Sequence, residues 1–186
     1  MDPRTGALLD ALVGHTPIDA REDRSLRVLR GALGQLALPF DAEADPTHVT
    51  ASAVVTGRRG VLLHRHKRLG VWLQPGGHVD AGESPLHAAQ RELAEETGIR
   101  AAAVSAAVLH VDVHPGGRGH THLDVRYHFT ADADPAPPAD ESPAVAWFAW
   151  TEAARIADAG LRGALTRLGG SPVAGTPNDD GRTPPR

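Results

Sequence analysis

Three glutamates whose spacing places them on one side of a helix are the residues of this sequence best suited to chemistry. Glu95 and Glu96 follow Glu92 by three and four residues, so the three side chains converge if the segment is helical. Like charges at this spacing destabilise an exposed helix by roughly 0.2–0.5 kcal/mol per pair. Clustered carboxylates suit a hard divalent cation such as Mg2+, which is commonly shared with substrate phosphates. The spacing alone leaves two interpretations open, a metal site and a solvated acidic face.

The residues around the glutamates predict the helix that positions them. Ser84 suits the position before the first helical turn, and Pro85 suits the first position of that turn. Gly98 suits the residue that ends a helix, because glycine adopts the left-handed conformation without strain. These signals predict a helix over residues 85–97, with the three glutamates on one face.

A pair of glycines precedes this helix and begins a longer pattern. Gly76 and Gly77 allow a sharp turn, or an approach to a ligand close enough for a carbonyl oxygen to bind metal. Taken alone, such a pair is also typical of an ordinary turn. From Gly77 to Ile99 the sequence resembles, without a gap, the signature of the Nudix hydrolase family, the Nudix box. The matching positions are Gly77, Glu83, Arg91, Glu92, Leu93, Glu95, Glu96, Gly98 and Ile99.

The resemblance implies both a fold and an activity. The fold is α+β, an α/β/α sandwich with a mixed β-sheet between helices. The activity is hydrolysis of a diphosphate linkage in a nucleoside diphosphate derivative, by attack of a metal-activated water on phosphorus. The implied metal is Mg2+, with Mn2+ as a substitute. Arg91 is implied to pair with and orient a carboxylate, and Gly77 and Glu83 to support the site. The implied metal ligands are Glu92, Glu95, Glu96 and the carbonyl oxygen of Gly76.

The group that accepts the proton of the attacking water is less closely defined. Glu95 or Glu96 could take this proton. In many members the general base is instead a glutamate outside the motif, and Glu141, just ahead of a predicted strand, is our candidate. A loop carboxylate without a catalytic role is the alternative interpretation of Glu141.

Histidines are the least ordinary feature outside the motif, and the sequence contains 11 of them. His120, His122 and Asp124 alternate along a predicted strand, so their side chains share one face. This face, together with His78, could bind a transition metal or substrate, or it could be an ordinary polar strand face. Pro115 lies sixteen residues after the motif. Relatives that act on ADP-ribose or nucleotide sugars often carry a proline there, although Pro115 also fits a simple Pro-Gly turn.

Hydrophobic patterns place strands and helices around the motif. Apolar residues alternate from Val49 to Val55 and from Leu123 to Phe129, and a hairpin turn is predicted at 57–60. Another strand is expected from Ala144 to Trp150. Helices are expected before residue 40 and from Glu152 to Leu168, the latter interrupted near Gly160. We therefore expect an N-terminal helical extension packed on the core (residues 1–46), a Nudix domain (47–169) and a disordered tail (170–186).

The composition disfavours several classes of protein. A net charge of -4 and a pI near 6.2 argue against a domain that grips long nucleic acid. The sequence has no cysteine, which excludes a disulfide framework and thiolate metal sites. No apolar run approaches the roughly 18 residues of a membrane span. We therefore expect a cytoplasmic protein that acts on a small nucleoside diphosphate derivative without a membrane partner. Because many relatives are dimers, the resemblance also allows a homodimer.

Two functions other than hydrolysis share the fold. An isomerase of prenyl diphosphates needs a catalytic cysteine in its usual form, and this sequence has none. A non-catalytic, Nudix-like ligand-binding sensor is the main alternative. The motif usually decays in such sensors, whereas here it is complete. Turnover of a nucleoside diphosphate derivative separates the hydrolase from the sensor.

Overall fold

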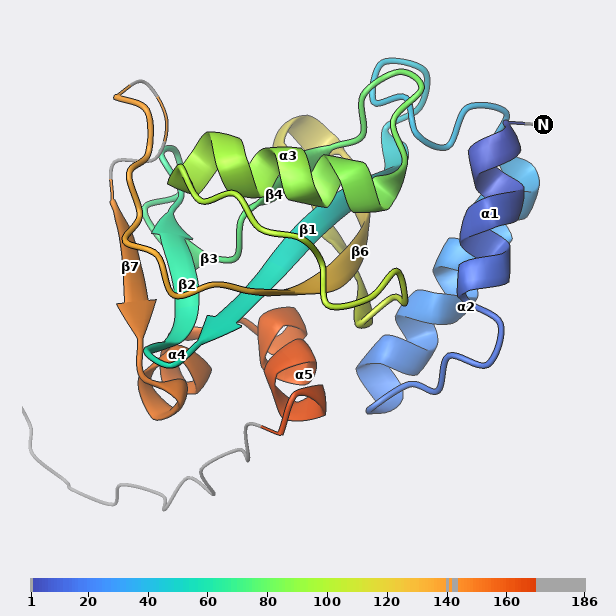
Figure 1. Ribbon diagram of the computed structural model, residues 1–186. Helices are drawn as coiled ribbons and strands as arrows, with labels where there is room; N and C mark the ends of the chain where they lie inside the picture. The colour runs from blue at the N-terminus through green and yellow to red at the C-terminus, as the bar shows by residue number, and fades with distance from the viewer. Residues whose placement is uncertain (1, 140, 142–143, 170–186) are drawn as a thin grey trace, which may run out of the picture.

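The computed structural model describes residues 2–139, 141 and 144–169. A mixed β-sheet lies between helices on its two faces (Figure 1). Strand β1 (Thr47–Gly57) runs parallel to β6 (Thr121–Thr130) at the centre, and the other pairings are antiparallel. The expected α+β fold is therefore confirmed. The remaining strands are β2 (Gly60–Arg65), β3 (Trp72–Leu73), β4 (Gly76–His78), β5 (His110–Pro115) and β7 (Val145–Phe148).

The order of the strands brings distant segments together. The main path is β3-β2-β1-β6-β5, while β4 also pairs with β1 and β7 also pairs with β2. The predicted hairpin at 57–60 is present, because Gly57 pairs with Gly60. Gly60 has φ 110°, a conformation that side chains rarely adopt. Strand β1 thus contacts β4 on one side and β6 on the other, and these two strands carry residues of the candidate site.

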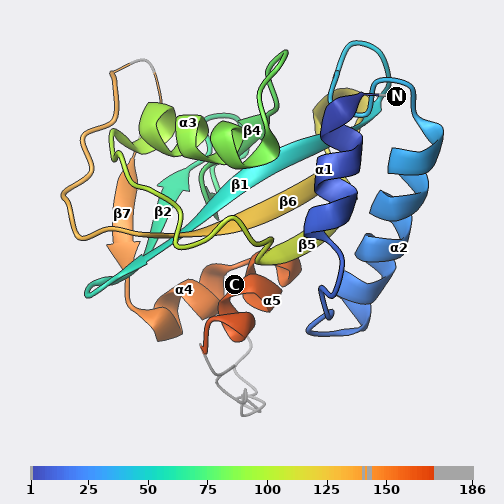
Figure 2. The same cartoon turned by 45° about the vertical axis from the view of Figure 1, so that its right-hand side comes forward.

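The two faces of β1 have different partners. Val49, Ala51 and Val55 point into the main hydrophobic core and pack with Leu93 of helix α3 (Pro85–Thr97). The opposite face packs partly on helices α4 (Trp150–Ile156) and α5 (Ala159–Arg167). Figure 2 shows α3 on one side of the sheet and α4 and α5 on the other. The alternation read from the sequence therefore assigns the faces correctly.

Helix α3 begins and ends at the residues that the sequence indicates. The hydroxyl of Ser84 accepts a hydrogen bond from the backbone N–H of His87 at 3.2 Å. Gly98 follows the helix with φ 73°, in the left-handed region. These local signals fix the register of the helix, and the register decides which side the glutamates face.

The N-terminal segment forms two helices, α1 (Pro3–Ala11) and α2 (Ala20–Gln35), whose leucines join the main core. Helix α2 covers the outer edge of β5. The backbone N–H of Val111 donates to Glu22 at 3.0 Å, and that of Val113 donates to Ser25 at 3.1 Å. Side chains of α2 thereby take the hydrogen bonds that another strand would otherwise make.

The C-terminal elements differ slightly from the sequence predictions. The strand expected from Ala144 to Trp150 is β7, which ends at Phe148, and Trp150 already begins α4. The break between α4 and α5 lies ahead of Gly160, where Asp158 caps α5 by accepting from the N–H of Leu161 at 2.7 Å. Gly160 lies inside α5, and a Cβ at this position would overlap the carboxylate of Asp112, which accounts for the glycine. The tail predicted over residues 170–186 lies outside the described residues. Within the described part of the chain, every helix is too short or too polar to cross a membrane.

Candidate active site

Helix α3 presents its glutamates to the two glycines of β4. The backbone N–H of Gly76 donates to the carboxylate of Glu96 at 2.9 Å. A Cβ on Gly77 would overlap the carboxylate of Glu92, and a Cβ on Gly76 would overlap the side chain of Ser52. The two glycines lie in a paired strand rather than in a turn, and they allow a close approach of backbone and carboxylates.

Arg91 holds the carboxylates of the motif together. Its guanidinium donates to Glu83 at 3.0 Å, to Glu92 at 2.9 Å and to Glu95 at 2.9 Å. It also donates to the carbonyl oxygen of His78 at 2.9 Å. Partial burial opposes its charge, but these carboxylates raise the pKa of Arg91 above its already high ordinary value. Arg91 therefore stays charged and fixes the glutamates relative to β4.

The negative charge at this site exceeds what Arg91 can balance. Burial raises the pKa of Glu96 to about 8, although the hydrogen bond from Gly76 opposes this shift and the nearby Glu92 adds to it. Burial likewise raises the pKa of Glu92. These half-buried carboxylates form a donor set made only of oxygen atoms, which suits a divalent cation. Such a cation would favour the charged form of the carboxylates, which burial disfavours. The residues present therefore fit the metal that the motif implies.

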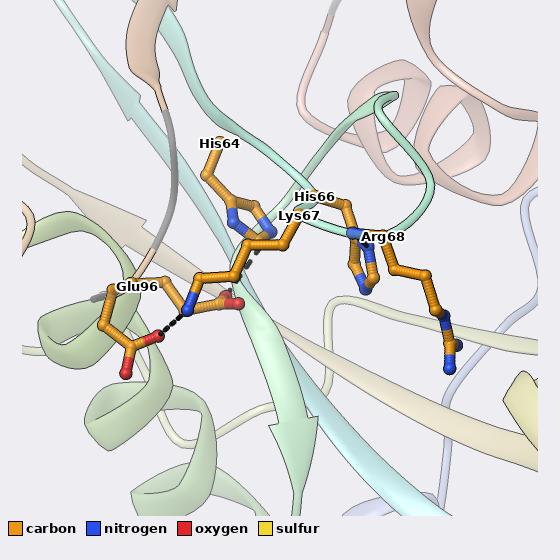
Figure 3. Close-up of a pocket in the computed structure, with 6 residues that line it drawn as sticks. His64, His66, Lys67, Arg68 and Glu96 are labelled. Carbon is orange, nitrogen blue, oxygen red and sulfur yellow. Dashed lines mark hydrogen bonds and ion pairs between the residues drawn. The ribbon is translucent and has the colours of Figure 1, made fainter. Parts of the chain in front are cut away.

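A pocket of about 320 Å3 opens beside Glu96 (Figure 3). One side is acidic, with Glu96 and Glu141, and the other is formed by the basic loop between β2 and β3. Lys67 Nζ lies 3.5 Å from a carboxylate oxygen of Glu141, and His64 Nε2 lies 3.4 Å from Glu96. Glu141 thus shares the pocket with Glu96, as a general base would require. The pocket is lined by His64, His66, Lys67, Arg68, Glu96 and Glu141.

The basic side of this pocket is not among the features predicted from the sequence. Its signal in the sequence is a run of five residues, His64-Arg65-His66-Lys67-Arg68, shortly before the Trp72 strand. A dense cationic run beside a suspected phosphate site is a candidate for phosphate recognition. The sequence does not show that this run lies opposite α3, because that position depends on strand β2.

A second cluster lies on the polar face of the sheet, where three histidines come together. One possible ligand atom from each of His48, His78 and His122 lies within 4.8 Å of the others. His120 lies beside them, with its ring centroid 5.2 Å from that of His48. Burial lowers the pKa of His48, and burial and the neighbouring imidazoles lower the pKa of His122 to about 4. His48 and His122 are therefore neutral near pH 7. The sequence pattern indicates His78, His120 and His122, but it gives no sign that His48 joins them.

Asp124 and Pro115 lie apart from the imidazoles. The carboxylate of Asp124 is buried, accepts from the hydroxyl of Ser52 at 2.7 Å and pairs with Arg126 at 2.8 Å. It is therefore engaged in the interior and is not brought to the surface with His120 and His122. Pro115 is exposed and ends β5, where it pairs with Thr121 of β6.

Comparison with known proteins decides the family. The model of the NUDIX domain matches residues 46–168. The chain belongs to the Nudix family. A MutT Nudix hydrolase from Burkholderia pseudomallei has a similar structure, with a TM-score of 0.54 and 29% identity, covering 64% of this chain and 96% of that one. A Nudix hydrolase from Clostridium perfringens gives a TM-score of 0.58 at 25% identity, covering 66% of this chain and 96% of that one.

Curated relatives of this Nudix chain match it over shorter segments. An RNA pyrophosphohydrolase from Rhizobium meliloti (strain 1021) is 40% identical over 76 residues, which are 35% of this chain and 45% of that protein. An m7GpppN-mRNA hydrolase from Xenopus laevis is 38% identical over 79 residues, 39% of this chain and 27% of that protein. The chain thus spans less than half the length of these curated relatives.

Proposed function

We propose that this chain hydrolyses a diphosphate linkage in a nucleoside diphosphate derivative, with a divalent metal ion as cofactor. One observation carries the proposal. Glu92 and Glu96 of α3 lie against the glycine pair of β4, and the guanidinium of Arg91 binds Glu92 and Glu95. Burial raises the pKa of both Glu92 and Glu96. An excess of half-buried carboxylates beside a pocket with a basic wall is suited to a metal and a polyphosphate together.

Each residue of the site has a role that follows from its position. Glu92, Glu95, Glu96 and the carbonyl oxygen of Gly76 would hold Mg2+ or Mn2+. When bound, the metal would neutralise charge on the phosphate oxygens and lower the pKa of the attacking water. Arg91 positions the carboxylates of Glu92 and Glu95 through its hydrogen bonds. Gly77 leaves the space that the Glu92 carboxylate occupies, and Glu83 anchors the other end of Arg91.

The pocket supplies groups for the substrate and for the proton. Lys67 and Arg68 line the wall that faces the acidic side. Their charges favour phosphate oxygens at this position, which orients the substrate next to α3. Glu96 and Glu141 are the candidate acceptors for the proton of the attacking water, because both carboxylates line the pocket.

The size and charge of the site favour a small substrate. A pocket of about 320 Å3 admits a diphosphate and an attached sugar, and the net charge of -4 disfavours a long nucleic acid. ADP-ribose and nucleotide sugars are therefore our first candidates, as the position of Pro115 also suggests. The names of the Rhizobium and Xenopus relatives make RNA a second class to test.

The test is turnover of a panel of nucleoside diphosphate derivatives and 5′-phosphorylated RNA in the presence of Mg2+. We expect release of a phosphate-containing product, and a loss of roughly 10²–10⁴-fold in kcat for Glu95→Gln or Glu96→Gln. The exposed Glu43→Gln variant is the matched control and should retain activity. Wild-type levels in both site variants would refute the assignment of the glutamates. A wild-type protein that binds one compound tightly without turning it over would instead support the sensor.

A further inference from the structure

The three imidazoles on the polar face of the sheet form a cluster that the proposed hydrolysis does not use. They come from three different strands, His48 from β1, His78 from β4 and His122 from β6. His48 pairs directly with His122 in the parallel register, so both side chains point to the same face. His78 pairs with Thr50, which lies two residues from His48 on that face. The sheet itself therefore holds the three rings together.

The distances allow one ion to contact all three residues. Their ligand atoms lie within 4.8 Å of one another. Imidazole nitrogens bound to Zn2+ at about 2.0–2.1 Å lie roughly 3.3 Å apart in a tetrahedral site. Side-chain shifts on the order of 1 Å are sufficient to close this difference.

A buried nitrogen without a partner is the second, independent observation. His48 is fully buried, and its Nε2 has no hydrogen-bond partner among the described residues. Its Nδ1 lies 3.2 Å from the carbonyl oxygen of Asp45, to which Nδ1–H donates. This contact fixes the neutral tautomer in which Nε2 carries the lone pair, as in metal-bound histidines whose other nitrogen donates to a carbonyl. A buried polar atom in this state costs folding free energy unless a ligand satisfies it.

We propose that His48, His78 and His122 bind a transition-metal ion of the Zn2+ class, at a site distinct from the carboxylates of α3. A donor set of three neutral imidazoles favours Zn2+, Co2+ or Ni2+ over Mg2+, which prefers oxygen. Three protein ligands leave a coordination position open for water or an anion. The half-buried His120 lies beside the cluster, with its ring 5.2 Å from that of His48.

The site has an entry path and a fixed relation to the candidate active site. His78 is exposed, so an ion reaches the cluster from solvent. The carbonyl oxygen of His78 accepts from Arg91 at 2.9 Å, while its ring lies with the imidazoles, 5.0 Å from that of His48. Strand β4 thus lies between the two sites. Its backbone at His78 binds Arg91 of the carboxylate site, and the ring of His78 belongs to the histidine cluster.

Cobalt binding tests this proposal on the full chain, purified without a histidine tag and stripped of metal. Co2+ is titrated in the presence of excess Mg2+, which occupies the oxygen ligands. We expect one equivalent of Co2+ to bind with the intense visible absorption of a four- or five-coordinate nitrogen site. His78→Gln and His122→Gln should each weaken binding at least roughly tenfold. His87→Gln, which removes an exposed imidazole of α3, is the matched control, and Glu95→Gln should also leave the spectrum unchanged.

The results that overturn the proposal are equally specific. They are the absence of Co2+ binding in excess Mg2+, the weak absorption of a six-coordinate oxygen site, or unchanged binding in both histidine variants. X-ray absorption of the zinc-loaded wild-type protein gives a second measurement that needs no variant. It should count three or more imidazole ligands, and a shell dominated by oxygen would refute the site.

Discussion

Glu22 offers a test of how the N-terminal helices are attached to the domain. The side chain is fully buried between α2, β5 and α5. Its carboxylate accepts from the N–H of Ile18 at 2.7 Å, from the N–H of Val111 at 3.0 Å and from Arg167 at 2.8 Å. It also lies 2.8 Å from Nε2 of His15. Replacing Glu22 by glutamine keeps the shape but removes the charge and one acceptor.

The pKa of Glu22 gives the size of the effect. Burial opposes ionisation, but the bonds with His15, Ile18 and Arg167 lower the pKa of Glu22 from 4.5 to about 2. At about 1.4 kcal/mol per unit, the ionised form contributes about 3 kcal/mol to the free energy of unfolding at neutral pH. Because the folded-state pKa is the lower one, this contribution is complete above pH 4.5 and is lost as the pH falls toward 2. At pH 3 roughly 2 kcal/mol of it is gone.

Urea unfolding followed by circular dichroism measures this contribution. We expect Glu22→Gln to lower the free energy of unfolding by about 2–4 kcal/mol at pH 7, since the buried partners lose their charged acceptor. The gap between variant and wild type should narrow by about 2 kcal/mol at pH 3. The exposed Glu43→Gln variant controls for the loss of a charge. A gap below about 1 kcal/mol at pH 7, or one that is the same at both pH values, would show that the carboxylate does not hold the helices in this way.

The remaining predictions concern the candidate metal site and a helix packed beneath the sheet. Gly77→Ala places a methyl group against the carboxylate of Glu92, so the Mg2+ concentration for half-maximal activity should rise roughly 10–100-fold, while an unchanged titration would contradict this contact. Mg2+ affinity should increase between pH 6 and 9, because a proton with a pKa of about 8 must leave Glu96 before the ion binds; calorimetry showing equal affinities would exclude this coupling. Gly160→Ala should lower the free energy of unfolding by about 1–3 kcal/mol through overlap with its neighbours. Gly31→Ala, where the added methyl group enters open space, should instead raise the free energy of unfolding by about 0.5–1 kcal/mol. Thermal denaturation of the two variants tests this difference.

The parts of the site that depend on local sequence were predictable. The cap at Ser84, the proline after it and the glycine at residue 98 define α3 without reference to the rest of the chain. The register of α3 then brings Glu92, Glu95 and Glu96 to one side, as their spacing predicts. Arg91 also binds the carboxylates as the family resemblance implied.

Features that depend on strand pairing were not predictable. His48 lies beside His122 only because β1 and β6 are parallel neighbours, since the two histidines are 74 residues apart in the sequence. Asp124 shares the alternation of His122, yet it lies deeper in the sheet, where Arg126 and Ser52 engage it. Alternation indicates which face a residue occupies, but the neighbouring strands and α5 decide whether that face is open or covered.

The hydrogen bonds of Arg91 affect how an ion would bind at the proposed metal site. They take one oxygen atom of Glu92 and one of Glu95, which leaves the second oxygen of each carboxylate for an ion. The arginine and the ion would therefore share these carboxylates. The carboxylates would then keep their positions when the ion enters with a phosphate-bearing substrate and when it leaves with the product, so the site would be ready for the next turnover.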